Sequence, residues 1–395
     1  MKKLTLISAA VAAALTAGSA FAVDFNGYFR AGTGISASGN GDQAVNKNAV
    51  GRLGNEDDNY YEFGLAEELQ TGEQTWKLES MIAQGNSGSN GWEDGDFNVA
   101  QFAVKAKGLI ASDKEAELWA GKTYYQRKDI HITDFYYLNT SGTGGGISNL
   151  SVMGDKKLSV AVLSDGETEQ SSSYIFDARL ANIGLWADAS LEVAVAYNFA
   201  TEVTDETEAA DDGVLTSFIL HQGLSNGFNQ TVFQYGTAGY GVQAANLWGS
   251  GTYYTRGTDE NNDAVGYRLL NWGVVSVGEN WEVGHQLAYL TGEDLGASGA
   301  ERDQISVVAR PMYKWNDTMR TIFEAGYTAG EETDGSDFGN MKATVAQAWA
   351  MGDSFWSRPE IRVYGTYHVD SENDNAFGSG EDTELVVGIQ AEAWW

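Results

Sequence analysis

The closing segment, residues 384–395, alternates between apolar and polar or small side chains and ends on an aromatic ring. Successive side chains of a β-strand point to opposite faces, so Leu385 and Ile389 share one face while Glu392 and Trp394 share the other. Strands of transmembrane barrels show this pattern, with an apolar face toward lipid and a polar face toward the lumen. The pattern therefore predicts a large ring, Trp394, directed into a polar lumen, where it can stack on a ligand.

The chain begins with a recognisable targeting segment. Lys2 and Lys3 precede a short apolar run, and an Ala-x-Ala site at residues 20–22 comes directly before the alternating pattern. We therefore expect a secretory signal peptide over residues 1–22 and a single exported domain over residues 23–395. The apolar run is too short for a retained anchor, and no later stretch has the roughly 18 consecutive apolar residues of a transmembrane helix.

The composition suits long, uninterrupted strand ladders. The chain has 48 Gly but only 2 Pro and no Cys, so few ladder hydrogen bonds are lost to proline and no disulfide holds the fold. A transmembrane strand needs roughly 9–11 residues, which predicts an all-β transmembrane antiparallel barrel of about 18 strands. Alternating segments followed by Gly, Asn, Asp or Ser clusters recur at residues 75–82, 191–199, 216–221, 231–235, 304–310 and 361–369.

A soluble secreted β-sandwich or propeller would also show regular alternation. Two features weigh against that architecture. Many of the alternating segments lack a second apolar face that could pack a core, and the chain ends on a strand with a terminal aromatic residue. We therefore favour the membrane barrel.

Charge and motifs narrow the function. The formal net charge of −31 disfavours nucleic acid as a partner, because a strongly acidic chain repels phosphates at long range. No cofactor is predicted, although acidic loops could collect a divalent cation such as calcium. The four histidines lack metal-ligand spacing, and no phosphate-binding or nucleophile-elbow motif appears. His131 near Asp129 and Asp134 leaves an outer-membrane hydrolase as an alternative, but a polar contact is the commoner role.

The first predicted strand repeats the combination of a ring and a charge on the polar face. Alternation sends Tyr28 and Arg30 to the lumen, and Tyr60 and Glu62 follow the same parity farther along. A sugar has a face of C–H groups that stacks on aromatic rings and a rim of hydroxyls that binds charged side chains. The rings could instead fill the lumen or form an interfacial girdle. Barrel closure brings Trp394 beside this strand, so the three rings can line one stripe.

Two polar segments stand out between the predicted strands. Residues 127–137 mix charges with aromatic rings before a glycine-rich stretch, which suits an inward-folded loop that constricts a channel. A solvated extracellular loop fits that composition about as well. Residues 85–96 place a lone Trp92 among polar residues. Such a ring needs a partner, which can be its own barrel, a neighbouring chain or a ligand.

The sequence closely resembles the maltoporins, the trimeric sugar-specific porins of Gram-negative outer membranes. The resemblance runs nearly end to end, in an ordered series that chance does not supply. Its most specific motifs are VDFNGY (23–28), RLGNE (52–56), WAGK (119–122), YQR (125–127), DFYY (134–137), GFN (227–229), RPMYKW (310–315), WSRP (356–359) and AWW (393–395).

The resemblance implies an 18-stranded barrel that acts as a homotrimer among the lipid and lipopolysaccharide of the outer membrane. It implies facilitated diffusion of maltose and maltodextrins, without catalysis. The implied aromatic slide, which guides the sugar by stacking, consists of Tyr28, Tyr60, Phe228, Trp356 and Trp394, with Trp92 supplied by a neighbouring subunit. The implied polar track, which exchanges hydrogen bonds with sugar hydroxyls, consists of Arg30, Arg52, Glu62, Arg127, Asp129 and Asp134, and Tyr136 matches the residue that narrows the channel.

The sequence departs from the family pattern at one position, and alternative functions remain open. Asn98 stands where the family usually has a basic residue of the track, so one cation is missing. The chain could be a porin for a different oligosaccharide, or a general porin whose rings only fill space. It could also be a structural or adhesive barrel, which predicts a plugged lumen. The net charge and the inward acids lead us to expect a preference for cations.

Overall fold

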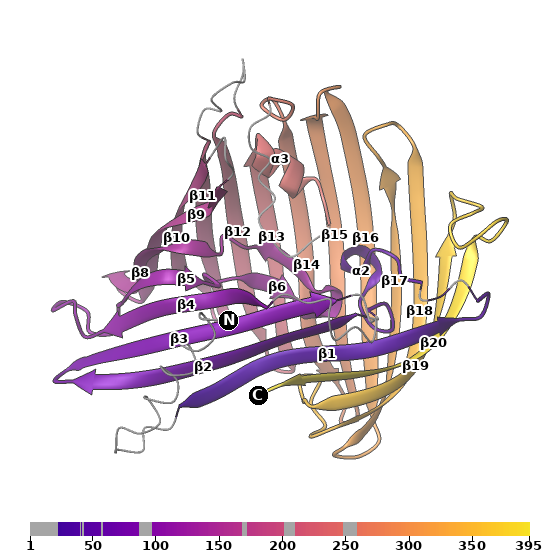
Figure 1. Ribbon diagram of the computed structural model, residues 1–395, viewed down its shortest axis with the longest axis horizontal. Helices are drawn as coiled ribbons and strands as arrows, with labels where there is room; N and C mark the ends of the chain where they lie inside the picture. Colours follow the sequence, from indigo (N-terminus) through magenta and orange to yellow (C-terminus); the bar gives the residue numbers. More distant parts are fainter. Residues whose placement is uncertain are drawn as a thin grey trace, which may run out of the picture.

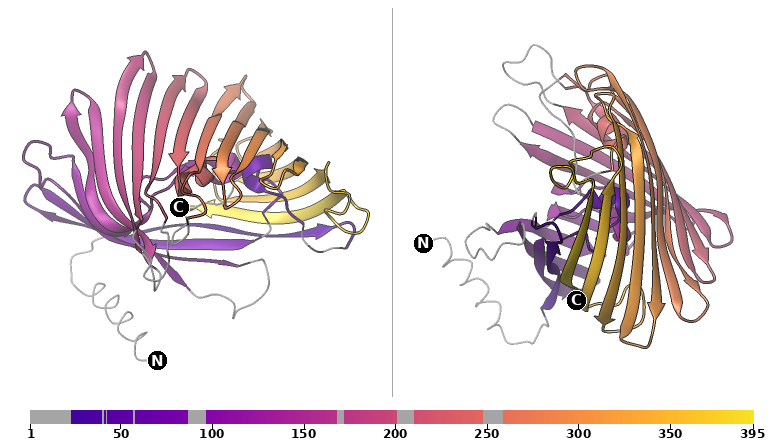
Figure 2. Two further views of the ribbon diagram at one scale, coloured as in Figure 1. Left: turned by 90° about the horizontal axis from the view of Figure 1, so that it is seen from above. Right: turned by 90° about the vertical axis from the view of Figure 1, so that its right-hand side faces the viewer.

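The computed structural model describes residues 23–39, 41, 43–56, 58–86, 97–167, 172–200, 210–247 and 259–395. Eighteen strands form one sheet in which every pairing is antiparallel. The sheet closes into a barrel because β1 pairs with β2 on one side and with β20 on the other (Figures 1 and 2). The predicted fold class and strand number are therefore confirmed. The expected signal peptide lies outside the described residues.

The elements fall into barrel strands and short pieces within the connections. No helix in the described ranges is long and apolar enough to cross a membrane. The barrel strands are β1 (Asp24–Ser36), β2 (Asn59–Thr71), β3 (Gln74–Asn86), β4 (Asn98–Lys107), β5 (Glu117–Thr123), β8 (Gly142–Met153), β9 (Lys156–Glu167), β10 (Ser172–Trp186), β11 (Ala189–Ala200), β12 (Gly213–Leu224), β13 (Gly227–Thr237), β14 (Val265–Val277), β15 (Trp281–Leu295), β16 (Ala300–Lys314), β17 (Met319–Glu331), β18 (Asp337–Ala350), β19 (Glu360–Asp370) and β20 (Thr383–Trp394). The pieces within connections are α2 (Lys47–Val50), β6 (Lys128–Ile130), the 3₁₀ helix η1 (His131–Thr133), β7 (Phe135–Leu138) and α3 (Gly239–Ala244).

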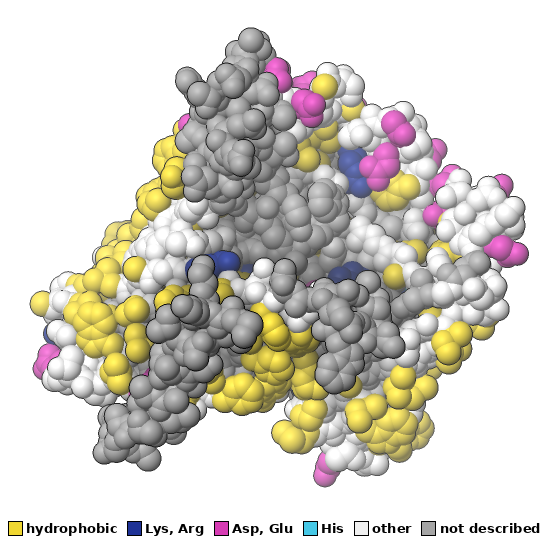
Figure 3. Space-filling model, in the orientation of Figure 1, with side chains coloured by type: hydrophobic (Ala, Val, Ile, Leu, Met, Phe, Trp, Pro, Cys, Tyr) yellow, Lys and Arg dark blue, Asp and Glu magenta, His cyan; other side chains and the backbone are white. Residues whose placement is uncertain are grey.

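The alternation predicted for the last strand is the alternation observed. In β20 the polar Gln390 and Glu392 are 2% and 1% exposed, whereas Leu385 and Val387 are 44% and 54% exposed. The apolar face therefore points outward and the polar face inward, the reverse of a soluble sandwich. Figure 3 shows hydrophobic side chains spread over the outer wall and acidic ones along its edge.

Register across the closing strands brings particular inward residues into rows. Tyr28 of β1 lies opposite Trp394 of β20 on one side and Glu62 of β2 on the other. Two residues farther along, Arg30 lies opposite Tyr60 in the same way. Directly opposed side chains of antiparallel strands come within about 5 Å at Cβ. Strand pairing alone thus places rings beside charges on the inner wall.

The predicted inward-folded loop is present and crosses the lumen. From one end to the other, residues 124–141 bind the inner wall on opposite sides of the barrel. Tyr124 donates to Glu62 of β2 at 2.9 Å, and Thr140 donates to Asp177 of β10 at 2.8 Å. Between them, Thr133 donates to Gln286 of β15 at 2.6 Å. These contacts fix the loop in place across the channel.

A second segment, residues 43–56, also folds inward, which the sequence did not predict. It carries α2 and lies on the inner side of the wall (Figure 1). Asn48 donates to the backbone carbonyl of Thr133 at 2.8 Å, so the two inward segments bind each other. The α3 connection packs inward as well, since Asn46 donates to the carbonyl of Leu247 at 2.9 Å.

A buried carboxylate fixes the second segment to the wall. Glu324 of β17 accepts hydrogen bonds from the backbone N–H of Leu53 at 2.9 Å and from Arg310 at 2.5 Å. Lys342 of β18 donates to the same carboxylate at 2.7 Å. Gly51 (φ +96°) lies so close that an added Cβ would come within 2.3 Å of the Glu324 carboxylate. The approach therefore requires glycine there.

We predict that Glu324→Ala strongly destabilises the barrel. The change leaves Arg310 and Lys342 buried without their carboxylate, which costs about 3–5 kcal/mol for a broken buried pair. The measurement is the temperature at which the folded protein loses its gel mobility shift in detergent. Glu331→Ala, an exposed carboxylate on the same strand, is the matched control and should unfold like the native protein. Equal unfolding temperatures for the two variants would contradict this role for Glu324.

Candidate functional site

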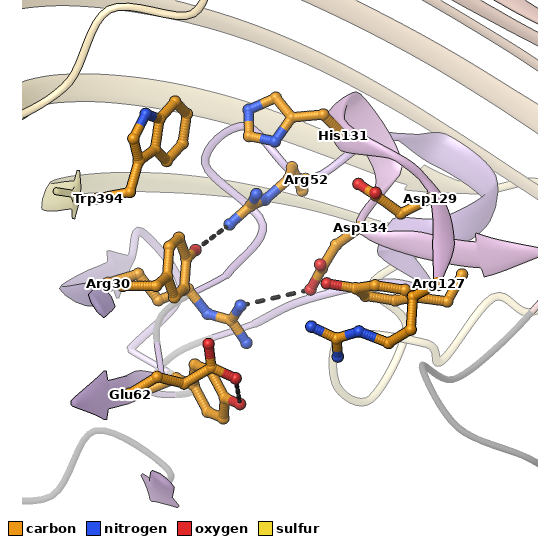
Figure 4. Close-up of a pocket in the computed structure, with 11 residues that line it drawn as sticks. Arg30, Arg52, Glu62, Arg127, Asp129, His131, Asp134 and Trp394 are labelled. Atoms are coloured by element: carbon orange, nitrogen blue, oxygen red, sulfur yellow. Dashed lines mark hydrogen bonds and ion pairs between the residues drawn. The ribbon is translucent and has the colours of Figure 1, made fainter. Parts of the chain in front are cut away.

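A cavity of about 300 Å³ lies where the inner wall of β20, β1 and β2 faces the two inward segments (Figure 4). The wall and the segments contribute side chains from opposite sides of this space. The wall supplies Tyr28, Arg30, Tyr60, Glu62 and Trp394, residues 43–56 supply Arg52, and residues 124–141 supply Arg127, Asp129, His131, Asp134 and Tyr136.

Aromatic rings follow one another from the wall of the cavity to the inward loop. The centroids of Tyr28 and Tyr60 are 6.0 Å apart. Trp394 lies 5.6 Å from His131, which in turn lies 5.3 Å from Trp356. These spacings allow successive rings of one extended ligand to meet successive aromatic faces.

The guanidinium groups of Arg30 on the wall and of Arg52 on residues 43–56 are bound by acids of the protein. Arg30 donates to both carboxylate oxygens of Asp58 at 2.7 Å and to Asp134 at 3.3 Å. Arg52 donates to Glu56 at 2.7 Å and to the hydroxyl of Tyr28 at 2.8 Å. Tyr28 in turn donates to Glu392 at 3.0 Å. This network fixes the Tyr28 ring at the cavity before any ligand arrives.

Two charged groups of the loop lack such partners. Among the residues that the structure describes, the side chains of Arg127 and Asp129 form no hydrogen bond or ion pair. Arg127 instead lies over two rings, with its guanidinium carbon 3.5 Å from the Tyr124 centroid and 4.6 Å from that of Tyr136. Burial and the neighbouring Asp134 raise the pKa of Asp129 above its ordinary value. Arg127 can therefore donate hydrogen bonds to a ligand in the cavity, and Asp129 can accept them.

The structure brings together most, but not all, of the predicted site. Every predicted residue of the polar track, Tyr136 and three predicted slide residues line the cavity. Trp356 does not line it but continues the row of rings through His131. Phe228 lies apart on β13, where its ring packs on Trp272 at 5.1 Å. Trp92 lies outside the described residues, and Asn98 begins β4 opposite Ala83.

His131 is the lining residue that the predicted site did not include. Its ring lies between Trp356 and Trp394, and Arg358 lies 3.3 Å from its Nε2. Burial, together with nearby Arg52, lowers the pKa of His131 well below its ordinary value, so the ring is neutral at neutral pH. It therefore stands in the row as an uncharged ring, at an interplanar angle of 87° to Trp394. The sequence around His131 does not predict this position, because Trp356 and Trp394 are far from His131 in the chain.

Comparison with known proteins supplies the family. Residues 23–395 match the LamB porin family. The chain is 73% identical over 414 residues to the maltoporin of Vibrio cholerae serotype O1, with all of both chains covered. It is 45% identical over 399 residues to the maltoporin of Photobacterium profundum, with 94% of each chain covered.

Solved structures bear on the fold alone. OpdQ of Pseudomonas aeruginosa aligns with a TM-score of 0.53 at 8% identity, over 94% of this chain and 99% of that one. OccK1 (OpdK) of the same organism aligns with a TM-score of 0.52 at 10% identity, over 95% and 99%. The family model covers residues 23–395, and the identities of the two relatives are far above those of these structures. The chain therefore belongs to the LamB porin family, the sugar-specific channels of the outer membrane, which are not enzymes.

Proposed function

We propose that this porin carries maltose and maltodextrins across the outer membrane by facilitated diffusion. The observation that carries the proposal is the pairing of a row of rings with Arg127 and Asp129, a donor and an acceptor that form no ion pair with the described residues. Linear glucose chains present C–H faces and hydroxyl rims together. The C–H faces can stack on the rings while the hydroxyls form hydrogen bonds with Arg127 and Asp129. The relatives named maltoporin support the same substrate.

Passage proceeds by exchange of contacts along the cavity. The sugar faces stack in turn on Tyr60, Tyr28 and Trp394, while hydroxyls accept from Arg127 and donate to Asp129. Hydrogen bonds to charged groups are stronger than neutral ones, but each sugar unit meets only a few of them at once. A channel must release what it binds, so a series of weak sites serves better than one tight site. The expected affinity is moderate.

Several parts of the proposal concern the surroundings of the channel. The chain is exported with loss of residues 1–22 and lies among lipid and lipopolysaccharide of the outer membrane. It works without a cofactor, and any divalent cation such as calcium is held by acidic loops. Its acids favour cations over anions. A general porin would share these properties, so sugar recognition is what separates the two.

The channel assembles as a homotrimer in this proposal. Support comes from a patch of rings on the outer face of β1 and β2 and at the adjoining ends of β4 and β20. We call it the aromatic patch, and it consists of Phe25, Tyr61, Phe63, Phe97 and Trp395. Phe25 and Phe63 lie 5.3 Å and 6.1 Å from Trp395, and Tyr61 lies 5.4 Å from Phe63. The described part of β3 ends at Asn86, two residues beyond Gln84, which pairs with Tyr61 of this patch.

We predict that Trp394→Ala weakens maltotriose binding about 3- to 10-fold, because a stacked ring contributes roughly 0.5–1.5 kcal/mol beyond burial. Titration of the sugar-blocked ion current in a planar bilayer measures the binding constant. Trp349→Ala removes an outward-facing ring of β18 that is 46% exposed, and it should leave binding unchanged. If Trp394→Ala binds maltotriose as the native channel does, the general porin is favoured.

We predict that Phe63→Ala lowers the fraction of trimer that survives in mild detergent. Phe323→Ala is the matched control, because both rings face outward and both are 38% exposed. Only Phe63 belongs to the aromatic patch, so only its loss should weaken contacts between protomers. Size-exclusion chromatography with light scattering measures the assembly. An equal loss of trimer in both variants would place the contact elsewhere.

A further inference from the structure

Tyr124 joins the wall and the loop of the candidate site without lining the cavity. It is the first residue after β5, and its backbone N–H donates to Gln101 of β4 at 3.0 Å. Its hydroxyl donates to Glu62 of β2 at 2.9 Å. Its ring lies beneath the guanidinium of Arg127 at 3.5 Å. One side chain therefore contacts both an acid of the wall and a base of the loop.

The two groups that Tyr124 contacts depend on few other contacts. Within the described part of the chain, Arg127 has no carboxylate partner, so the rings of Tyr124 and Tyr136 are what hold its guanidinium. Glu62 receives a hydrogen bond from Tyr60 at 2.6 Å as well as the one from Tyr124, both on Oε1. Neither hydrogen bond uses Oε2 of Glu62, so this oxygen can accept from another donor.

The hydroxyl of Tyr124 stays a donor under physiological conditions. Burial and the nearby Glu62 raise the pKa of Tyr124 to about 12, so the phenol keeps its proton at neutral pH. The backbone N–H of Tyr124 is also held by Gln101, which fixes the point from which the side chain projects. A long, flexible arginine held on a fixed ring loses less conformational freedom when it binds a ligand than a free one does.

We propose that Tyr124 is a positioning residue for sugar recognition, which holds Glu62 and Arg127 as a preset acceptor and donor on opposite sides of the narrow part of the channel. The inference rests on the proposed function. It assigns to Tyr124 a role through its two neighbours and no contact with the sugar.

The test is a set of variants in purified native-length protein, reconstituted in planar bilayers and titrated with maltotriose. Tyr124→Phe keeps the ring under Arg127 but removes the bond to Glu62, and we expect about threefold weaker binding. Tyr124→Leu removes both contacts, and we expect about tenfold weaker binding. Conductance without sugar should stay within about twofold in both. Tyr125→Phe is the control, because the Tyr125 ring packs on Trp119 at 5.2 Å and away from the cavity.

A double-mutant cycle separates positioning from a general structural effect. If Tyr124 acts through Glu62, then Tyr124→Phe has no further effect on affinity in a Glu62→Gln background. Additive effects in the cycle, or native affinity in Tyr124→Phe, would overturn the positioning role while leaving the proposed function in place. A native channel that maltotriose does not block would overturn the proposed function, and this inference with it.

Discussion

Pairing of buried charges across the lumen is the constraint on which this structure depends. Apolar side chains such as Leu53, Ile132 and Phe135 pack inside the barrel. The inner face of the wall also carries many charged groups, and these need partners from within the barrel. Glu324 binds the Leu53 backbone together with Arg310 and Lys342. Residues 124–141 are held by hydrogen bonds to Glu62, Gln286 and Asp177 of the wall. The inward segments are therefore held by the same polar groups that would otherwise be left unsatisfied.

The candidate site combines charged groups that take part in this pairing with charged groups that do not. Arg30 and Arg52 are taken up by acids of the protein and serve to fix Tyr28 and the loop. In the described part of the chain, Arg127 and Asp129 stand at the cavity without such bonds, and in the proposed function they supply the donor and the acceptor for a sugar. The distinction between charges that build the channel and charges that serve the substrate follows from geometry, since both kinds line the same space.

Strand parity made the wall half of the site predictable from the sequence. Tyr28, Tyr60 and Trp394 were expected in the lumen because a period of two residues is a local property of each strand. The loop half required the family resemblance, since nothing local to Arg127 or Arg52 says which way a loop folds. The inward fold of residues 43–56 and the place of His131 between Trp356 and Trp394 depend on contacts distant in sequence. Phe228, which the family resemblance assigns to the aromatic slide, does not line the cavity.

The most direct test of the account is the conductance of single native channels titrated with maltotriose, with sucrose as the comparison sugar. We expect maltotriose to block the current saturably and sucrose to block it far more weakly, because only a linear glucose chain can cover successive rings while its hydroxyls reach Arg127 and Asp129. A current that neither sugar alters, or that both alter equally, would contradict the claim that this cavity recognises maltodextrins.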